Sequence, residues 1–257
     1  MKPTAILVGV CIPALAVNMD PFYNHALRHA NIGFSWKFND GPSSGLKDIT
    51  FPVNMAKTPH EQGYYLSQQF SFRGVRHPGH IAIQPRPDNS KGQTMLRANF
   101  TSHQSGTATC HPACRVGTGL GGAVGGRAGV SCAIDVPADY AHTFNLTVEN
   151  VRDANTWRGL LVDTVTRKTH EIGVWTLPSG AGDIRRSRGG FVEYFPRAGH
   201  QVSCLNFPKI EATVYHPWSN SAGAGALHDV RDMDLCGKDI FKKIKVTDGF
   251  TVYYGRG

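Results

Sequence analysis

The sequence predicts an all-β fold, an antiparallel β-sandwich of jelly-roll-like form that is stapled by disulfides and contains little helix. Apolar and polar residues alternate with period two through most of the 257 residues, as they do in strands with one buried face. The 29 Gly and 15 Pro supply turns, and the 13 Phe and 8 Tyr are residue types enriched in sheets. Because helical patterns do not separate these strands, we expect antiparallel pairing.

The alternation predicts about twelve short strands. In the first, apolar residues share one face, and a loop rich in Gly, Pro and Ser follows at 40–45. Only 229–236 and 238–244 hold a weak helical pattern. In chain order, the strands are expected at 32–38, 49–53, 64–72, 81–83, 96–100, 132–136, 144–148, 157–164, 170–175, 191–195, 210–216 and 251–254.

The N-terminus resembles an export signal. Lys2 supplies a positive charge, an apolar stretch follows, and Ala14-Leu15-Ala16 is typical of a cleavage site. We therefore expect a signal peptide at 1–16, a β-sandwich domain at 17–218, and a C-terminal extension at 219–257 that packs on the same domain. A buried N-terminal strand is the alternative for the first segment. No later stretch is long and apolar enough to span a bilayer, so the predicted location is secreted and extracellular.

Five cysteines remain after such a cleavage, which predicts two bridges and one remaining thiol in an oxidising compartment. Cys110 and Cys114 compete for Cys132 across a glycine-rich loop, and Cys204 then pairs with Cys236. A zinc site is the alternative, but the Cys-x3-Cys spacing is not usual for zinc. We expect no metal and no cofactor.

Two N-glycosylation sequons fit the same compartment, at Asn99-Phe100-Thr101 and Asn145-Leu146-Thr147. Each asparagine alternates with apolar residues of its predicted strand. Asn99 and Asn145 are therefore expected to face solvent and to carry glycans.

Polar residues within or next to the predicted strands supply candidates for chemistry. Tyr65, His80 and Arg86 are the residue types that a polysaccharide lyase uses. Glu193, between apolar neighbours, could serve a glycoside hydrolase, which needs a second carboxylate nearby. Each of these side chains could equally belong to an ordinary surface. No motif for a nucleophilic triad or a dinucleotide site is followed by the helix that it requires.

Aromatic residues and charge suggest binding rather than catalysis. Trp157 and Trp175 lie on strands that are expected to be neighbours, and sugar rings pack on exposed aromatic faces. Core packing is the alternative for both. The formal net charge of +8 attracts acidic polymers, but no nuclease motif is present, so nucleic acid is not an expected partner. The oligomeric state is left open.

Several segments recur together in one known family. They are 80–84, Cys114 followed by 117–122, then 131–132, 143–149, 157–163, 171–173 and 191–195. In order and spacing, the chain from 31 to 218 resembles the secreted β-rich family called domain of unknown function 3472. The resemblance implies a sandwich of a kind that often binds carbohydrate, without known catalytic residues. It also implies that Cys114 pairs with Cys132.

These observations lead to one functional hypothesis and two alternatives. We expect a secreted, glycosylated β-sandwich that binds a carbohydrate or a cell-surface or host partner. The first alternative is a carbohydrate-active enzyme, a polysaccharide lyase or a glycoside hydrolase. The second is a secreted effector or toxin. The ligand-binding candidates are Tyr65, His80, Arg86, Trp157, Trp175 and Glu193.

Overall fold

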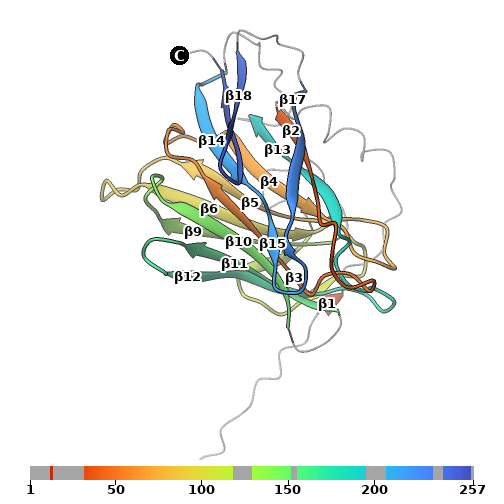
Figure 1. Cartoon of the computed structure of the whole chain (residues 1–257). Helices are drawn as coiled ribbons and strands as arrows, with labels where there is room; N and C mark the ends of the chain where they lie inside the picture. The colour runs from red at the N-terminus through yellow and green to blue at the C-terminus, as the bar shows by residue number, and fades with distance from the viewer. Residues whose placement is uncertain are drawn as a thin grey trace, which may run out of the picture.

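Two β-sheets packed face to face form the chain in its computed structural model, which describes residues 12–13, 32–117, 129–151, 155–194, 207–233 and 240–255 (Figure 1). Every pairing between named strands is antiparallel. The described residues contain no helix. The predicted antiparallel β-sandwich is thereby confirmed.

We call the larger sheet sheet A; it has 11 strands. Two of them, β15 and β16, form a short branch beside β3. In sheet order the strands are β1 (Ile12–Pro13), β7 (Ala108–Thr109), β12 (Thr169–Thr176), β11 (Thr156–Asp163), β10 (Thr143–Asn150), β3 (Asp48–Asn54), β14 (Ile210–Tyr215), β19 (Gly249–Tyr254) and β18 (Phe241–Val246), with β15 (Trp218–Ser219) and β16 (Gly223–Ala224) at the branch.

Sheet B is the second sheet and has 8 strands. Its middle strands β4, β5 and β6 follow one another in the sequence and carry the site described below. In sheet order the strands are β17 (Ala226–Asp232), β2 (Ile32–Lys37), β13 (Ser187–Tyr194), β4 (Tyr64–Phe70), β5 (Gly79–Arg86), β6 (Met95–Ser102), β9 (Val130–Pro137) and β8 (Cys114–Val116).

The C-terminal part of the chain belongs to both sheets. β17 pairs with β2 in sheet B, whereas β18 and β19 extend sheet A beyond β14. The weak helical pattern at 229–236 and 238–244 is therefore wrong where the structure describes these residues. Lysines on an outermost strand such as β18 discourage pairing with another chain, which explains its polar sequence. The expected boundary after residue 218 falls inside β15.

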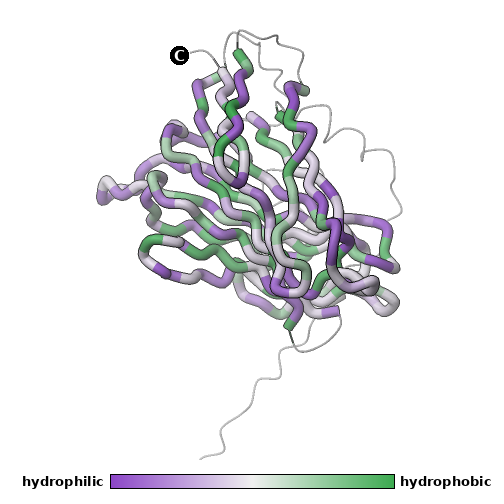
Figure 2. The backbone as a smooth tube through the Cα atoms, in the orientation of Figure 1, coloured by the Kyte–Doolittle hydropathy of each residue, from purple (hydrophilic) through white to green (hydrophobic). Residues whose placement is uncertain are grey.

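The core lies between the sheets and is rich in aromatic side chains. Figure 2 shows hydrophobic and hydrophilic residues alternating along the strands, as a two-layer core requires. Phe100 of β6 stacks on Trp175 of β12, with ring centroids 4.5 Å apart, and Phe72 packs on Trp157 of β11 at 4.8 Å. At Gly159 of β11 an added Cβ would lie 2.5 Å from the Phe100 ring, so the sheets approach closely there.

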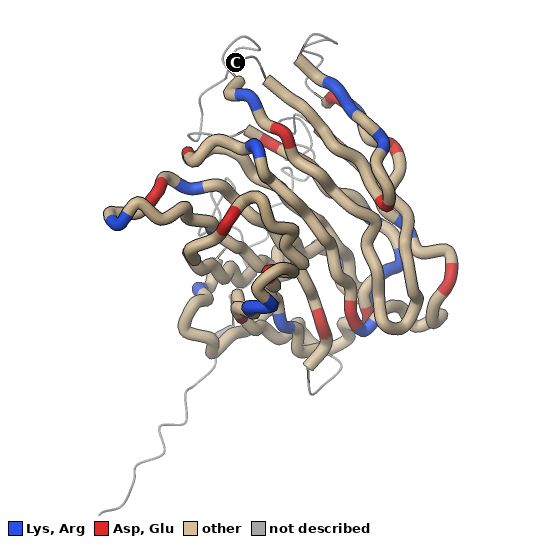
Figure 3. The backbone as a smooth tube through the Cα atoms, turned by 60° about the vertical axis from the view of Figure 1, so that its left-hand side comes forward, with Lys and Arg blue, Asp and Glu red and all other residues tan. Residues whose placement is uncertain are grey.

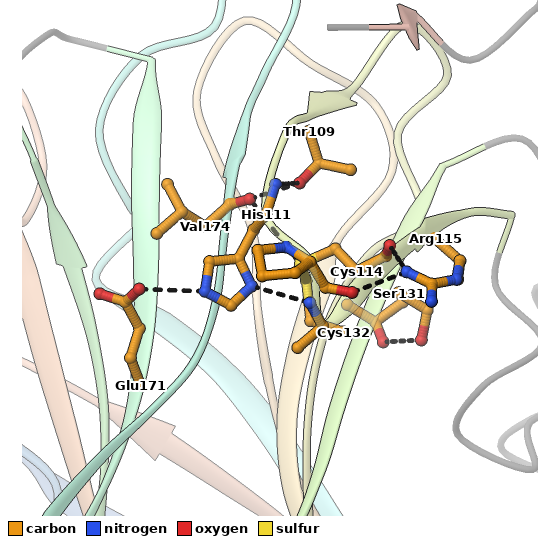
Figure 4. Close-up of a disulfide and its surroundings, with 11 residues drawn as sticks. Thr109, His111, Cys114, Arg115, Ser131, Cys132, Glu171 and Val174 are labelled. Carbon is orange, nitrogen blue, oxygen red and sulfur yellow. Dashed lines mark hydrogen bonds and ion pairs between the residues drawn. A yellow bond between two sulfur atoms is a disulfide. The ribbon is translucent and has the colours of Figure 1, made fainter. Parts of the chain in front are cut away.

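A disulfide joins Cys114 of β8 to Cys132 of β9, as the family resemblance implied (Figure 4). The two cysteines are register partners on adjacent strands. The bridge packs on Gly173 of β12 in sheet A, where an added Cβ would lie 2.6 Å from the Cys114 sulfur. The bridge therefore fixes the end of sheet B and seals one side of the core.

The remaining cysteines differ from the expectation in one respect. Cys110 is disulfide-bonded. It is therefore not the one free thiol that the sequence analysis expected among the five cysteines. The predicted partners Cys204 and Cys236 lie outside the described residues.

Ile12 and Pro13 of β1 pair with β7, within the segment expected to be a signal peptide. The signal peptide and secretion remain predictions. In the described part of the chain, no helix has the length and apolar character needed to cross a membrane.

Replacing Cys114 and Cys132 together by Ala should lower the free energy of unfolding by about 3 kcal/mol. The bridge spans a sequence separation of 18, and opening it frees that loop in the unfolded chain. Urea unfolding of the purified variant measures the loss. An unchanged unfolding midpoint and slope would contradict a stabilising role for this bridge.

Candidate functional site

One face of sheet B is polar although most of its central side chains are buried. Along β4, β5 and β6, alternate side chains enter the core between the sheets, and the intervening ones project from the opposite face. We call this opposite surface the polar face of sheet B. Polar groups withdrawn from water need hydrogen-bond partners, so this surface is the candidate site. Its buried polar members are Tyr65, Ser67, His80, Gln84, Asn99, Thr101 and Ser131.

Strand register places these side chains in rows that run across the sheet. Glu193 of β13 lies opposite Tyr65 of β4. Gln84 of β5 lies opposite Arg97 of β6, and Arg97 lies opposite Asp135 of β9. Because β4 and β5 are adjacent, Tyr65 is also beside Gln84. One row therefore contains a carboxylate at each end and a phenol, a carboxamide and a guanidinium between them.

A chain of hydrogen bonds links five side chains on this face. Arg86 Nη2 donates to Gln84 Oε1 over 3.0 Å. Gln84 hydrogen-bonds the Tyr65 hydroxyl. That hydroxyl lies 3.0 Å from His80 Nε2, and His80 Nδ1 lies 2.9 Å from Nε2 of His103. We call this series the Arg86–His103 chain.

Burial keeps the central members of the chain uncharged. It raises the pKa of Tyr65 well above its usual value, and the charge of Glu193 raises it further. Burial, and then the neighbouring His103, lower the pKa of His80 well below its ordinary value. A neutral imidazole has one N–H. With Tyr65 donating to Nε2, the proton on Nδ1 of His80 donates to His103, and every bond of the chain runs in one direction.

An ion-pair cluster holds the Arg86 end in place. Asp135 accepts from Arg97 Nε at 2.8 Å and from Nη2 at 2.5 Å, and Arg86 Nε lies 3.9 Å from the same carboxylate. The hydrogen bond from Arg97 lowers the pKa of Asp135. The backbone N–H of Arg86 donates to the Tyr140 hydroxyl. A positive charge is thus fixed beside Gln84.

Glu193 supplies a half-buried carboxylate next to the phenol of Tyr65. The Tyr65 ring stacks on Phe191, with centroids 6.4 Å apart and planes 16° from parallel. Tyr65, Phe191 and Ala82 form a small apolar cluster on this face, separate from the main core. The cluster places the Tyr65 ring above Ala82, so its hydroxyl reaches between His80 and Gln84.

Four sequence-predicted candidates meet on this face: Tyr65, His80, Arg86 and Glu193. They lie on three strands, Tyr65 on β4, His80 and Arg86 on β5 and Glu193 on β13, and the pairing of these strands brings them to one side. The imidazole partner of His80 in the structure is His103, which lies 23 residues further along the chain.

Sequence reasoning missed the other members of the site. Gln84 lies four residues after His80 and two before Arg86, so alternation alone would place it on the same side of a strand. Arg97 and Asp135 depend on the pairing of β6 with β5 and β9, which the sequence does not reveal. His103 lies just after β6, in a segment without a strand pattern.

The two tryptophans expected to bind sugar are wrong as ligand-binding residues. Trp157 and Trp175 face each other in register on β11 and β12, but their side chains point into the core. Their exposed fractions are 0% and 1%. Phe72 and Phe100 cover their faces, so neither tryptophan ring is available to stack on a sugar.

The two sequons have different outcomes. Asn99 is 0% exposed, so the prediction that it faces solvent is wrong, and a glycan has no room at its amide in this structure. The error arises because the polar face of sheet B is itself buried. Asn145 lies on β10 between two buried residues and is half-buried, as an outward position requires. Its glycosylation remains a prediction.

Elsewhere in the described part of the chain, charged side chains form ion pairs such as those of Arg158 with Glu149 and Glu171. Figure 3 shows Lys and Arg interspersed with Asp and Glu over the described chain. His111 bonds Glu171 at 3.1 Å on the outside of sheet A, beside the disulfide (Figure 4). Among the described residues, no group of three or more His, Cys, Asp or Glu is arranged to hold a metal ion.

Comparisons with known proteins give structural likenesses only. No protein-family model and no curated protein matches the chain. Solved structures of scytalido-glutamic peptidase match, one with a transition state analog inhibitor (TM-score 0.44, 7% identity) and one with a peptide-based analog (0.43, 9%). SCP-B, described as a member of the eqolisin family of peptidases and bound to Ala-Ile-His, matches with TM-score 0.41 and 10% identity. Each match covers 88% of this chain and 98% of the other.

The expected function of a carbohydrate-binding or partner-binding sandwich is therefore corrected. The burial of Trp157 and Trp175 removes the aromatic surface on which the carbohydrate-binding hypothesis depended.

The free energy of unfolding should fall as the pH decreases below about 6.5, the ordinary pKa of histidine. In the unfolded chain His80 takes up a proton there, whereas in the folded chain it stays neutral. The unfolded state then binds more protons, and His80 alone contributes a loss of up to about 1.4 kcal/mol per pH unit. Urea unfolding of the wild type and of His80→Gln between pH 8 and pH 5 measures the contribution.

The comparison isolates the hydrogen-bonded pair of His80 and His103, because the titrating groups outside this pair are the same in both proteins. His170 has a lowered pKa and His142 a raised one, and the contribution of each is subtracted when the variant is compared with the wild type. The variant should show a shallower loss below pH 6.5. Parallel pH profiles would mean that His80 titrates normally in the folded protein.

Proposed function

We propose that this chain is a hydrolase that cleaves amide bonds, with its active site on the polar face of sheet B. The observation that carries the proposal is the Arg86–His103 chain, which passes through Tyr65 directly opposite the carboxylate of Glu193. A base, a proton donor and a fixed positive charge thus share one surface, and a hydrolase needs these three functions. The proposal depends on these side chains and not on the likeness to solved peptidases.

Glu193 is the proposed general base. It is half-buried and ionisable, and it projects from the polar face beside Tyr65. Its carboxylate takes one proton from a water molecule, while the water oxygen forms a bond to the carbonyl carbon of the substrate. The negative charge that develops on the carbonyl oxygen is stabilised by the donors at the other end of the chain, Gln84 and the charged Arg86 behind it.

Tyr65 is the proposed proton donor. When the bond between carbon and nitrogen breaks, the Tyr65 hydroxyl gives its proton to the leaving nitrogen. To replace that proton, both imidazole bonds must reverse, so that His80 donates from Nε2 to the Tyr65 oxygen and accepts at Nδ1 a proton from His103 at the half-exposed end of the chain. Glu193 returns the proton of water to solvent. The net reaction converts an amide and water into a carboxylic acid and an amine.

An amide is a better match to this relay than an ester. An amine leaves as a neutral molecule only if its nitrogen receives a proton, whereas an activated alcohol leaves as an anion without one. Hydrolysis of an activated ester would therefore not require a series of hydrogen-bonded proton donors that ends near solvent. The Arg86–His103 chain therefore favours substrates whose leaving group requires a proton.

Glu193→Gln should reduce cleavage of fluorescein-labelled casein at least about 100-fold, because the carboxamide cannot accept the proton of water. The matched control is Glu149→Gln, which changes a carboxylate paired with Arg158 on sheet A and should leave the rate unchanged. Fluorescence release and mass spectrometry of new termini measure the activity. A wild-type rate in Glu193→Gln would eliminate Glu193 as the base.

Tyr65→Phe should separate the two leaving groups. The variant keeps the ring that stacks on Phe191 and loses only the hydroxyl. We expect cleavage of casein to fall about 100-fold, while hydrolysis of p-nitrophenyl acetate, whose leaving group needs no proton, falls much less. Steady-state rates with both substrates test this. Equal losses for both would assign Tyr65 a role other than proton donation.

A further inference from the structure

Asn99 is a buried polar residue without a hydrogen-bond partner. It lies on β6, opposite Ala82 of β5 and Ala133 of β9, and its side chain is 0% exposed. Neither its Oδ1 nor its Nδ2 has a partner in the structure. The Oγ of Ser67, which lies opposite Ala82 on the other side, is also unpaired and buried. Two unsatisfied polar side chains therefore flank one alanine in the middle of the polar face.

Neighbouring side chains do not satisfy Asn99 because they have other partners. On the same strand, Arg97 is held by Asp135, and Thr101 bonds the hydroxyl of Ser131 at 3.0 Å. Leaving a buried donor or acceptor unpaired costs about 1–3 kcal/mol for each group. An apolar side chain of the same shape would avoid this cost, so the carboxamide fits a ligand better than it fits the fold.

A carboxamide with a free donor beside a free acceptor matches one chemical group especially well. A peptide unit presents a C=O that accepts and an N–H that donates, so it can bond to Nδ2 and to Oδ1 of the same asparagine. The Ser67 hydroxyl adds a further donor or acceptor in the same row. An isolated anion or cation would satisfy only one half of the carboxamide.

The position of Asn99 relative to Tyr65 indicates which part of a substrate it would contact. The Tyr65 ring lies with Ala82 in the small apolar cluster, and its hydroxyl reaches between His80 and Gln84. Asn99 is the next residue across the sheet from Ala82. Only β5 lies between its strand and β4, which carries the proposed proton donor.

We propose that Asn99, assisted by Ser67, binds a main-chain peptide group next to the amide bond that is cleaved, so that the substrate class is an extended peptide. This inference rests on the function proposed above. Entry of a peptide requires part of the apolar cluster to move. Met233 packs against that cluster, and its unbranched, flexible side chain is suited to such movement.

Asn99→Leu tests the proposal because leucine has a similar shape and no polar group. Binding is measured in the Glu193→Gln background, by fluorescence polarisation with a fluorescein-labelled pool of randomised octapeptides. Adding Asn99→Leu should weaken binding at least about tenfold, while the melting temperature stays the same or rises by about 2–4 °C. A gain in stability with a loss of binding is a result that a structural role of Asn99 does not produce.

Two control variants accompany this test. Asn145→Leu changes the asparagine of the other sequon on sheet A and should not affect binding. Thr101→Val removes the sequon of Asn99 but keeps its carboxamide, so retained binding in that variant excludes an effect of a glycan.

Two results would overturn the inference. The first is unchanged peptide binding in Asn99→Leu. The second is a marked loss of stability without a loss of binding, which means that an internal water satisfies the carboxamide for structural reasons. If Glu193→Gln binds peptides through Asn99 but the wild type cleaves neither casein nor peptides, the inference stands and the proposed hydrolase function fails.

Discussion

The Arg86–His103 chain is the constraint on which the polar face of sheet B depends. It crosses strands β4 and β5 and continues to the segment after β6, so its bonds form only if these strands pair in the observed register. A shift by one residue would turn Tyr65 and His80 into the core and bring Leu66 and Ile81 to the polar face. The hydrogen bonds and the hydrophobic core therefore specify the same strand register. A shift in register would break the hydrogen bonds and would also expose the apolar side chains.

Local packing around β5 supports that arrangement. Gly79 begins the strand, and an added Cβ there would lie 2.5 Å from the Phe70 ring and 2.9 Å from the carbonyl oxygen of Thr101. The absence of a side chain lets β5 sit close to both neighbours immediately before His80. The rings of His80 and His103 then lie 5.0 Å apart, within reach of a direct hydrogen bond. The close packing of the backbone at Gly79 thus allows the direct hydrogen bond between His80 and His103.

Much of the fold could be predicted from the sequence, because period-two alternation is a local property. It located strands such as β10 and β11, whose buried residues alternate cleanly. Edge strands were not recognised, since β18 is exposed along most of its length. Alternation shows which residues lie on the same side of a strand. It does not show whether that side contacts solvent or another part of the protein.

The site was only partly predictable for the same reason. Alternation grouped Tyr65 with its side of β4 and His80 with its side of β5, but the contact between them depends on strand order. The failure at Asn99 has a different origin. In a two-sheet protein, the side opposite the core is normally wet, and the sequence offered no sign that sheet B is covered on both sides. A sheet buried on both faces with polar residues on one of them is physically unusual.

That unusual burial gives the polar face its chemical character. Removal from water raises the pKa of Tyr65 and lowers that of His80, which keeps both groups neutral and able to pass protons. The same burial makes the unpaired carboxamide of Asn99 and the hydroxyl of Ser67 costly to maintain. The disulfide between Cys114 and Cys132 and the aromatic core around Trp175 contribute to the stability of the sandwich. The hydrophobic core and the buried polar side chains therefore lie on opposite faces of sheet B.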